Sequence, residues 1–301
     1  MNFPTWDPQQ TQFGLGENYS LERADPTVFA IHFTAAELAQ NVWFRQSWDQ
    51  LVGRFSGEDI CFWIKHNQQR IGGVCIEPNL IGCLFLEPPH NNLNQVLFLL
   101  KGLLLRWSDP SKPIGTQSVN ADQLAAYCRI GFRITEIRRV MIRVTEPLPV
   151  TWPSGYALRS PTPADAAVLA TLFYECYTSG AEPRSQVDAQ GNVDYYFQHN
   201  VEPTVLPQAS TILVDAQSQQ VIAACLISLW EGWPLVYDVV VQRKIRGQGL
   251  ASAMLRQALN TLHTTYPVLR LFVTVGNASE AVYHNLGFVA GPESYWLNLK
   301  I

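Results

Sequence analysis

The sequence has no long apolar run and no excess of positive charge. Its most apolar stretch, residues 96–105, contains Lys101 and is followed by Arg106, so it is far too short to span a membrane. The formal net charge of −4 is not the excess of positive charge that is typical of a nucleic-acid-binding domain. No basic amphipathic run indicates membrane docking, and residues 1–7 lack the charged and apolar regions of a signal peptide. We therefore expect a cytoplasmic protein without nucleic-acid or membrane partners.

Patterns that hold a metal are also missing from the sequence. None of the six cysteines forms a Cys-x-x-Cys motif, and the six histidines show no metal-ligand spacing. Several cysteines lie in apolar strand or helix patterns, which is typical of buried thiols in a reducing compartment. The sequence predicts no metal site.

The length and the apolar content favour two globular domains. A chain of 301 residues is long for one domain and has a length typical of two domains of about 150 residues. The composition, 47% hydrophobic and 15% charged, is that of a globular protein with a large core. Residues 146–153 contain three prolines and read as a stiff linker. We expect an N-terminal domain over 1–148 and a C-terminal domain over 154–301.

Both halves of the sequence give the same order of elements. Hydrophobic periodicity predicts three strands, a helix, a strand, a helix and a strand in each half. Residues 120–132 echo residues 277–288: Tyr127 and Tyr283 are 156 positions apart (283 − 127), and so are the glycines of the two Gly-Phe pairs (287 − 131). Two copies of such a period indicate a duplicated domain rather than a solenoid.

Three segments give weaker signals. Residues 1–30 show no pattern that we can assign, and 34–38 resembles a capped helix start running towards Leu51 and Phe55. Residues 179–192, which contain Gly180, Pro183 and Gly191, are expected to be a loop. The closing strand is expected at 295–299.

The stretch 237–262 carries most of the functional information. It begins as a β-branched strand through Val241, passes through a basic turn with Gly247 and Gly249, and enters a helix with apolar residues at helical spacing. A helix N-terminus has unpaired N–H groups and a partial positive charge. Glycines let an anion approach that backbone, so the turn is interpreted as a phosphate cradle.

Other phosphate-binding motifs fit this stretch less well. The chain has no Gly-x-x-x-x-Gly-Lys sequence for a Walker loop. A dinucleotide fingerprint is disfavoured because five residues separate Val241 from Gly247, Ser252 takes the third glycine position, and 267–275 holds no acid. The structural alternative is an ordinary glycine-containing loop before an amphipathic helix.

Two motifs in the right order resemble the GNAT acetyltransferase family. Residues 239–251 resemble its acetyl-CoA motif, with Lys244 replacing the usual Gln or Arg at the first position, and residues 277–288 resemble its Asn-x-x-Ala-x-x-x-Tyr-x-x-x-Gly-Phe helix and turn. The resemblance implies an α/β (α+β) protein of two tandem GNAT-like domains, each a mixed, mostly antiparallel central sheet flanked by helices. Residues 88–94 of the first copy contain no Gly-x-Gly and no arginine, so that copy is expected to be degenerate for coenzyme binding.

The same resemblance implies acetyl-CoA as the cosubstrate of the C-terminal copy, with no metal. It places the carrier on the strand, the turn, the first helical turn and the second motif. The residues it implies are Val239, Val240, Val241, Arg246, Gly247, Gln248, Gly249, Leu250, Ala251, Ser252, Asn277 and Tyr283. The strand would contact the carrier through its backbone alone, so the valine side chains at these positions are equally consistent with a place in the core. Asn277 could equally serve as a helix cap, and Arg246 as a solvated loop residue.

Acyl transfer to an amine needs an acceptor for the amine proton and an acid for the leaving thiolate. Tyr283 matches the family's tyrosine near the sulfur and is our candidate acid; its alternative role is aromatic packing of the helix. Asp238 and Glu231 are the candidate bases, and a solvated strand-end carboxylate is the alternative for each.

The predicted function is an N-acetyltransferase that moves an acetyl group from acetyl-CoA to a primary amine of a small molecule or peptide by direct attack. The alternative is a non-catalytic acyl-CoA-binding sensor or regulatory protein. Transfer to a hydroxyl or thiol would use the same cradle. The sequence leaves open the acceptor, the acyl length and the oligomeric state.

Overall fold

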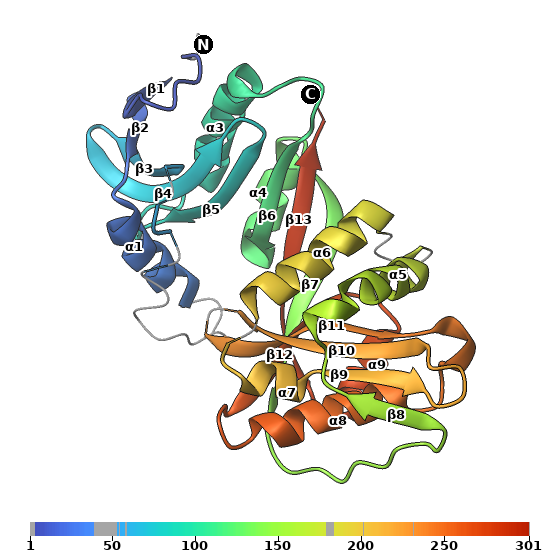
Figure 1. Cartoon of the computed structure of the whole chain (residues 1–301). Helices are drawn as coiled ribbons and strands as arrows, with labels where there is room; N and C mark the ends of the chain where they lie inside the picture. The colour runs from blue at the N-terminus through green and yellow to red at the C-terminus, as the bar shows by residue number, and fades with distance from the viewer. Residues whose placement is uncertain are drawn as a thin grey trace. The chain divides into compact units, whose positions relative to one another are not determined.

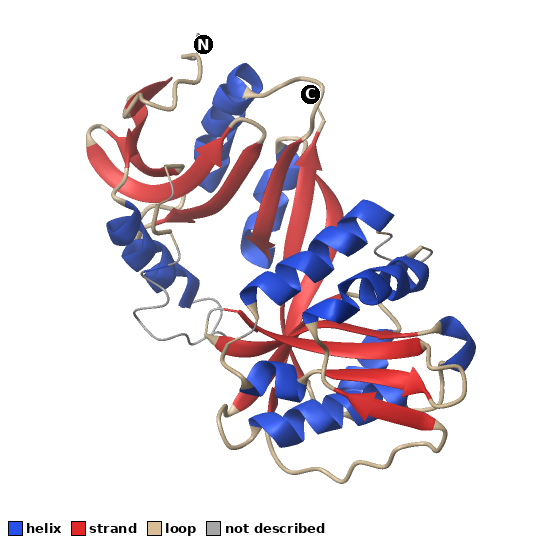
Figure 2. Ribbon diagram, in the orientation of Figure 1, coloured by secondary structure: helices blue, strands red, loops and turns tan. Residues whose placement is uncertain are grey.

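The structure is a computed structural model, shown in Figures 1 and 2. It describes residues 4–38, 53, 55–57, 59–178, 184–200, 202–230 and 232–300. The chain divides into two compact units. The first comprises Met1–Arg139 together with Pro292–Ile301, and the second comprises Val140–Gly291.

The first unit is built on a mixed sheet. Its strands are β1 (Gln12–Gly16), β2 (Tyr19–Arg23), β3 (Cys61–His66), β4 (Gln69–Glu77), β5 (Leu80–Leu86), β6 (Ile114–Asn120), the first part of β7 (Arg133–Val144) and the last part of β13 (Val289–Leu299). The strand order is β1-β2-β3-β4-β5-β6-β13-β7. The pairs from β1 to β5 are antiparallel, β5 and β6 are parallel, and β13 is antiparallel to β6.

Helices pack against both faces of this first sheet. They are α1 (Pro26–Leu38), α3 (Leu93–Trp107) and α4 (Ala121–Arg129). Successive side chains of a strand point to opposite faces. Along β3, Phe62 and Ile64 join the core formed with α3 and α4, whereas Cys61 and Trp63 join the core formed with α1.

The second unit repeats this architecture. Its sheet has the order β7-β12-β11-β10-β9-β8, with the last part of β7 at one end. The other strands are β8 (Tyr156–Arg159), β9 (Thr211–Asp215), β10 (Val221–Trp230), β11 (Trp233–Val241) and β12 (Val268–Thr274). The pairs from β8 to β11 are antiparallel, and β11 and β12 are parallel.

Helices also cover both faces of the second sheet (Figure 2). They are α5 (Ala166–Tyr177), α6 (Gln186–His199), α7 (Val205–Ala209), α8 (Leu250–Leu262) and α9 (Ser279–Asn285), with short 3₁₀ turns η1 (Pro163–Asp165) and η2 (Arg243–Ile245). Along β10, Leu226 joins the core with α5 and α6, whereas Cys225 joins the core with α7, α8 and α9. The predicted fold class, with mixed and mostly antiparallel sheets flanked by helices, is confirmed. Within the described residues no helix is long and apolar enough to cross a membrane.

The compact units differ from the domain ranges expected from the linker. Residues 140–148 belong to the second unit, and residues 292–301 belong to the first. Packing gives the reason: Met141 is buried in the core of the second unit, while Leu297 and Leu299 are buried in that of the first. β7 and β13 therefore each supply strand residues to both units.

The segment expected to be a loop at 179–192 is partly helical. Residues 179–183 lie outside the described residues, but α6 begins at Gln186. The Ser185 hydroxyl accepts the N–H of Asp188 at 3.1 Å, and the Asp188 carboxylate accepts the N–H of Ser185 at 3.2 Å. This capping box is readable in the sequence and would have identified the helix.

The N-terminal region also contains structure that the sequence pattern did not reveal. The unassigned segment 1–30 contains β1 and β2, and α1 begins at Pro26 rather than near Thr34. The Asp25 carboxylate accepts the N–H of Val28 at 2.9 Å, so an Asp-Pro pair starts this helix. Leu51, towards which the helix was expected to run, lies outside the described residues.

The start of α5 generates a stability prediction. The Asp165 carboxylate accepts hydrogen bonds from Arg159 (2.7 and 2.5 Å) and from the N–H of Thr162 (2.8 Å). Chiefly because of the Arg159 hydrogen bonds, the pKa of Asp165 falls to about 2. A depressed pKa stabilises the fold above the unfolded value, and that stability is lost as the pH falls through the folded value.

We therefore expect Asp165→Asn to lower the free energy of unfolding at pH 7 by about 1 kcal/mol. Between about pH 4 and pH 2 the difference from wild type should shrink, because the wild-type carboxyl becomes protonated. Urea unfolding at pH 7, 4 and 2.5 measures this, with the exposed Asp194→Asn as the control. A difference that persists unchanged at pH 2.5 would contradict the assignment.

Candidate functional site

The candidate site begins where β11 leaves its parallel neighbour. β11 pairs with β12 at Leu235↔Arg270 and Val236↔Leu271, and within the described residues the pairing ends there. On its other side β11 has a β-bulge: Asp238 is opposite Leu226, and Val236 is opposite Ile227, which leaves Tyr237 as the extra residue. A bulge increases the local twist and bends the strand. Within the part of the chain that the structure describes, one backbone edge of β11 beyond Val236 therefore has no neighbouring strand.

The turn between β11 and α8 is open at its two glycines. Gly247 and Gly249 have φ values of 81° and 78°, which side chains other than glycine disfavour. A Cβ added at either position would meet no heavy atom within 4 Å. Their backbone conformation requires glycine, and the space in front of both residues is free of protein atoms.

The first turn of α8 presents unpaired N–H groups. The first helical bond runs from the N–H of Ala253 to the carbonyl oxygen of Gly249, at 2.9 Å. The N–H groups of the three preceding helical residues have no helical acceptor, and the N-cap residue Gly249 has no side chain to accept them. Leu250, Met254, Leu255 and Leu259 hold the helix on the core, so its N-terminus is fixed. An anion at this turn would meet aligned donors and the positive end of the helix dipole.

Arg246 lies at the end of the strand. Its Nε donates to the carbonyl oxygen of Val241 at 2.9 Å, and the Cys176 thiol approaches the same oxygen at 3.6 Å. Burial raises the pKa of Cys176, and the neighbouring Arg246 only partly offsets this. Cys176 is therefore a neutral thiol, and the exposed Arg246 guanidinium carries the positive charge at this end of the turn.

Asp238 is buried in an ion pair. Its side chain is 3% exposed, and Arg184 donates to Oδ2 at 2.5 Å. The Tyr177 hydroxyl donates to Oδ1 at 2.7 Å, and the Arg184 guanidinium carbon lies 4.0 Å from the centroid of the Tyr177 ring. Burial, followed by the negative charge of Asp238, raises the pKa of Tyr177 well above its usual value. Tyr177 is therefore a neutral hydroxyl with its proton directed at Asp238.

Tyr283 lies on α9 and faces the same region. It is 7% exposed and packs in the core near Phe288, with ring centroids 6.0 Å apart. After burial and Asp238, the electrostatic interaction with Tyr283 also raises the pKa of Tyr177, so the two hydroxyls are electrostatic neighbours. Just before α9, the Asn277 side-chain oxygen accepts the N–H of Ser279 at 3.0 Å and its hydroxyl at 2.9 Å. Asn277 thus serves the helix start, as its structural alternative predicts.

The remaining sequence candidates divide by position. The side chains of Val239 and Val241 join the core under α8, and that of Val240 joins the core under α5, so only their backbones are available to a ligand. Gln248 is exposed and accepts a hydrogen bond from the Tyr156 hydroxyl at 3.1 Å. Ala251 and Ser252 belong to the first turn of α8. Glu231, one of the two candidate bases, lies outside the described residues.

Sequence reasoning missed Tyr177 and Arg184. Tyr177 is the last residue of α5 and belongs to no motif, and Arg184 falls in the segment expected to be a loop. Their distance from Asp238 along the chain leaves no local signal of the contact. Among the described residues, no group of three His, Cys, Asp or Glu side chains could hold a metal ion.

Part of the chain matches a known protein family. A sequence model of the GNAT acetyltransferase domain matches residues 194–295, which include β11, the glycine turn, α8 and α9. No curated protein sequence matches the chain. The general activity that this fold supports is acyl transfer.

Solved structures extend the similarity to the whole chain. A GCN5-related N-acetyltransferase from Sphaerobacter thermophilus is 15% identical with a TM-score of 0.73, covering 95% of this chain and 96% of that one. A tandem GNAT protein from the clavulanic acid biosynthesis pathway is 12% identical with a TM-score of 0.63, covering 93% and 98%. A GNAT-family acetyltransferase from Colwellia psychrerythraea is 11% identical with a TM-score of 0.59, covering 92% and 98%. The resemblance to the GNAT superfamily, tandem type, is confirmed: the whole chain has this fold, and residues 194–295 carry the family's domain.

The buried ion pair gives a prediction for stability. Removing one partner of a buried pair leaves an uncompensated charge and costs about 3 kcal/mol, whereas removing both charges costs much less. We expect Arg184→Met to lower the free energy of unfolding by roughly that amount. The double variant Arg184→Met/Asp238→Asn should recover most of the loss. Urea unfolding of the wild type, the single variant and the double variant measures these differences. A single variant as stable as the double variant would show that the buried Asp238 carboxylate does not need the charge of Arg184.

Proposed function

We propose that the Val140–Gly291 unit is an N-acetyltransferase that moves an acetyl group from acetyl-CoA to a primary amine of a small molecule or peptide. The observation that carries this proposal is the open glycine turn at the start of α8, next to the free edge of β11. The donors of the turn suit a diphosphate, and the extended edge suits an arm with amide groups. Tyr283 and Asp238 approach the same region from α9 and β11.

The binding roles follow from the contacts available. The N–H groups of Leu250, Ala251 and Ser252, with the backbone of Gly247, Gln248 and Gly249, would hold the diphosphate. Arg246 adds a positive charge there. The backbone of Val239, Val240 and Val241 would hydrogen-bond the pantetheine arm, as an added strand does at a sheet edge. The Asn277 oxygen is engaged by Ser279, so only its amide N–H₂ would be available to the carrier.

When bound, acetyl-CoA supplies a thioester carbonyl carbon, which the amine nitrogen attacks, and a C–S bond, which breaks. Tyr283 donates a proton to the leaving sulfur. The amine must lose one proton during the reaction, and Asp238 is our candidate to receive it. The Tyr177 hydroxyl donates a hydrogen bond to Asp238 and keeps oxygen lone pairs that can accept an amine N–H. The amine proton would thus reach the carboxylate through Tyr177, while Glu231 is the second candidate.

The sequence of the first unit supports one active unit per chain. The corresponding turn of the first unit, residues 87–92, contains two prolines and no glycine. We therefore propose that the first unit is degenerate for coenzyme binding.

The net charge of −4 favours neither nucleic acid nor anionic membranes as partners. A cytoplasmic location remains part of the proposal.

The glycine turn can be tested by binding. We expect Gly249→Val to raise the Kd for acetyl-CoA at least tenfold, because the side chain would enter the space in front of the turn and disfavour its φ of 78°. Gly191→Ala is the matched control, since a Cβ there also meets nothing within 4 Å but the residue lies in α6 with no positive φ. Isothermal titration measures both chains. Unchanged affinity in Gly249→Val would remove the basis of the proposal.

The proposed acid is tested by the equivalent tyrosine of the other unit. Tyr283→Phe should lower kcat by roughly 100-fold with the Kd for acetyl-CoA retained, because only the proton donor is lost. Tyr127→Phe, in the first unit, should leave kcat unchanged. Thiol release is followed with a panel of amino acids, polyamines, aminoglycosides and peptides. Wild-type binding of acetyl-CoA with no turnover on any amine would instead favour the sensor.

A further inference from the structure

The first unit contains a pocket at the position that corresponds to the candidate site of the second. β5 and β6 pair in parallel at Leu80↔Gly115 and Ile81↔Thr116, each 155 positions before its counterpart in β11 and β12 (235 − 80, 270 − 115). β5 also carries a register irregularity against β4 just beyond this pairing. The two strands therefore part in the same way, and the pocket opens there.

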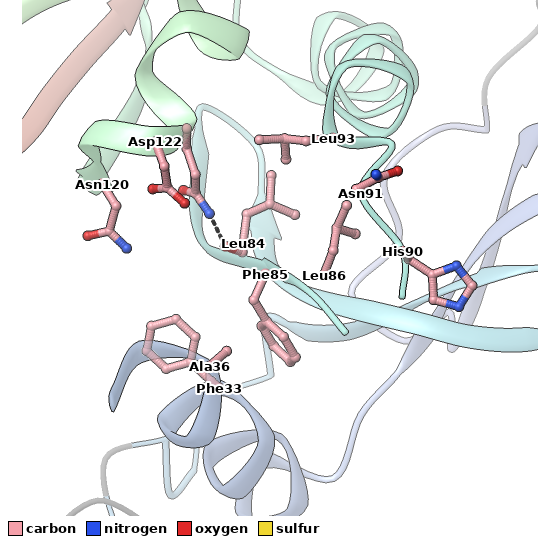
Figure 3. Close-up of a pocket in the computed structure, with 11 residues that line it drawn as sticks. Phe33, Ala36, Leu84, Phe85, Leu86, His90, Asn91, Leu93, Asn120 and Asp122 are labelled. Atoms are coloured by element: carbon pink, nitrogen blue, oxygen red, sulfur yellow. Dashed lines mark hydrogen bonds between the residues drawn. The ribbon is translucent and has the colours of Figure 1, made fainter. Parts of the chain in front are cut away.

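Residues from four segments line this pocket (Figure 3). They come from α1, from the end of β5, from the turn into α3 and from the start of α4. The lining residues are Phe33, Ala36, Leu84, Phe85, Leu86, His90, Asn91, Leu93, Asn120, Asp122 and Gln123. The pocket has a volume of about 190 Å³. A cavity on the order of 150 Å³ accommodates benzene, so the space suits a ligand with about one ring.

The lining has an apolar side and a polar side. Phe33 and Phe85 lie with ring centroids 6.0 Å apart and are 9% and 5% exposed. Figure 3 shows them opposite Asn120 and Asp122. The Gln123 amide is already committed, since it donates to the carbonyl oxygen of Leu84 at 2.9 Å.

The charged groups around the pocket determine whether it favours a positive or a negative ligand. Among the lining residues that the structure describes there is no lysine or arginine, and Asp122 is the one carboxylate. Asp122 is exposed at the start of α4, and it forms no ion pair with the residues that the structure describes. The N-termini of α3 and α4 favour an anion, but a helix end is worth about half a charge, and a carboxylate in the first turn offsets it. A ligand with a positive charge is therefore favoured over one with a negative charge.

From these observations we infer that the first unit binds a small primary ammonium compound that carries one aromatic or branched aliphatic group. The ammonium pairs with Asp122, and the apolar group lies against Phe33 and Phe85. This site is separate from the proposed acetyl-CoA site, and it does not depend on catalysis by the second unit.

The experiment compares three ligands of nearly the same shape on the full chain. Isothermal titration is carried out with 2-phenylethylamine, 2-phenylethanol and 3-phenylpropanoate. We expect the amine to bind most tightly and the carboxylate most weakly. Equal or tighter binding of the carboxylate would show that the helix N-termini determine which ligand charge the pocket prefers, and would overturn the inference.

Two variants locate the binding. Asp122→Asn should raise the Kd of the amine about tenfold without changing that of the alcohol, because only the charge is removed. Ala36→Leu should weaken both ligands by filling the pocket. Asp59→Asn is the control, since its carboxylate lies in the same unit and is 92% exposed. Amine affinity that is the same in Asp122→Asn and wild type would place the amine elsewhere and contradict the inference.

Discussion

The divergence of β11 from β12 after Val236 is the constraint on which the candidate site depends. A strand inside a sheet has both backbone edges paired, and such a strand offers nothing to a ligand. The bulge at Tyr237 bends β11 away while β10 continues to hold its other edge. The free edge then runs directly into a turn whose glycines leave the N-terminus of α8 uncapped. Strand edge and helix end together form one continuous row of backbone groups.

The surrounding side chains explain how this row stays open and ordered. Apolar residues of α8 fix the helix on the core, so its N–H groups keep their direction. Arg246 returns to the carbonyl oxygen of Val241 and ties the turn to the strand. Asp238, next to the bulge, is neutralised by Arg184 and oriented by Tyr177. In the first unit the two strands also diverge, but the corresponding turn, residues 87–92, contains no glycine, and the described residues line a pocket with one carboxylate.

Local patterns in the sequence predicted the parts of the fold that local patterns determine. The stretch 237–262 predicted a strand, a glycine turn and a helix in that order, and the structure has β11, the turn and α8 there. The helix at 186–199 was missed because Gly191 and Asn192 interrupt its pattern, although the capping box was present. Contacts between distant segments could not be predicted. The Arg184–Asp238 pair and the pairing of β13 with β6 depend on the folded chain and have no local signature.

The central claim is that a diphosphate-bearing thioester carrier binds at the start of α8 and not at the corresponding turn of the first unit. A crystal structure of the full chain with acetyl-CoA tests it most directly. The account predicts one carrier per chain, with its diphosphate hydrogen-bonded to the backbone of residues 247–252 and its thioester beside β11. A diphosphate found at residues 87–93 instead, or away from both turns, would contradict it.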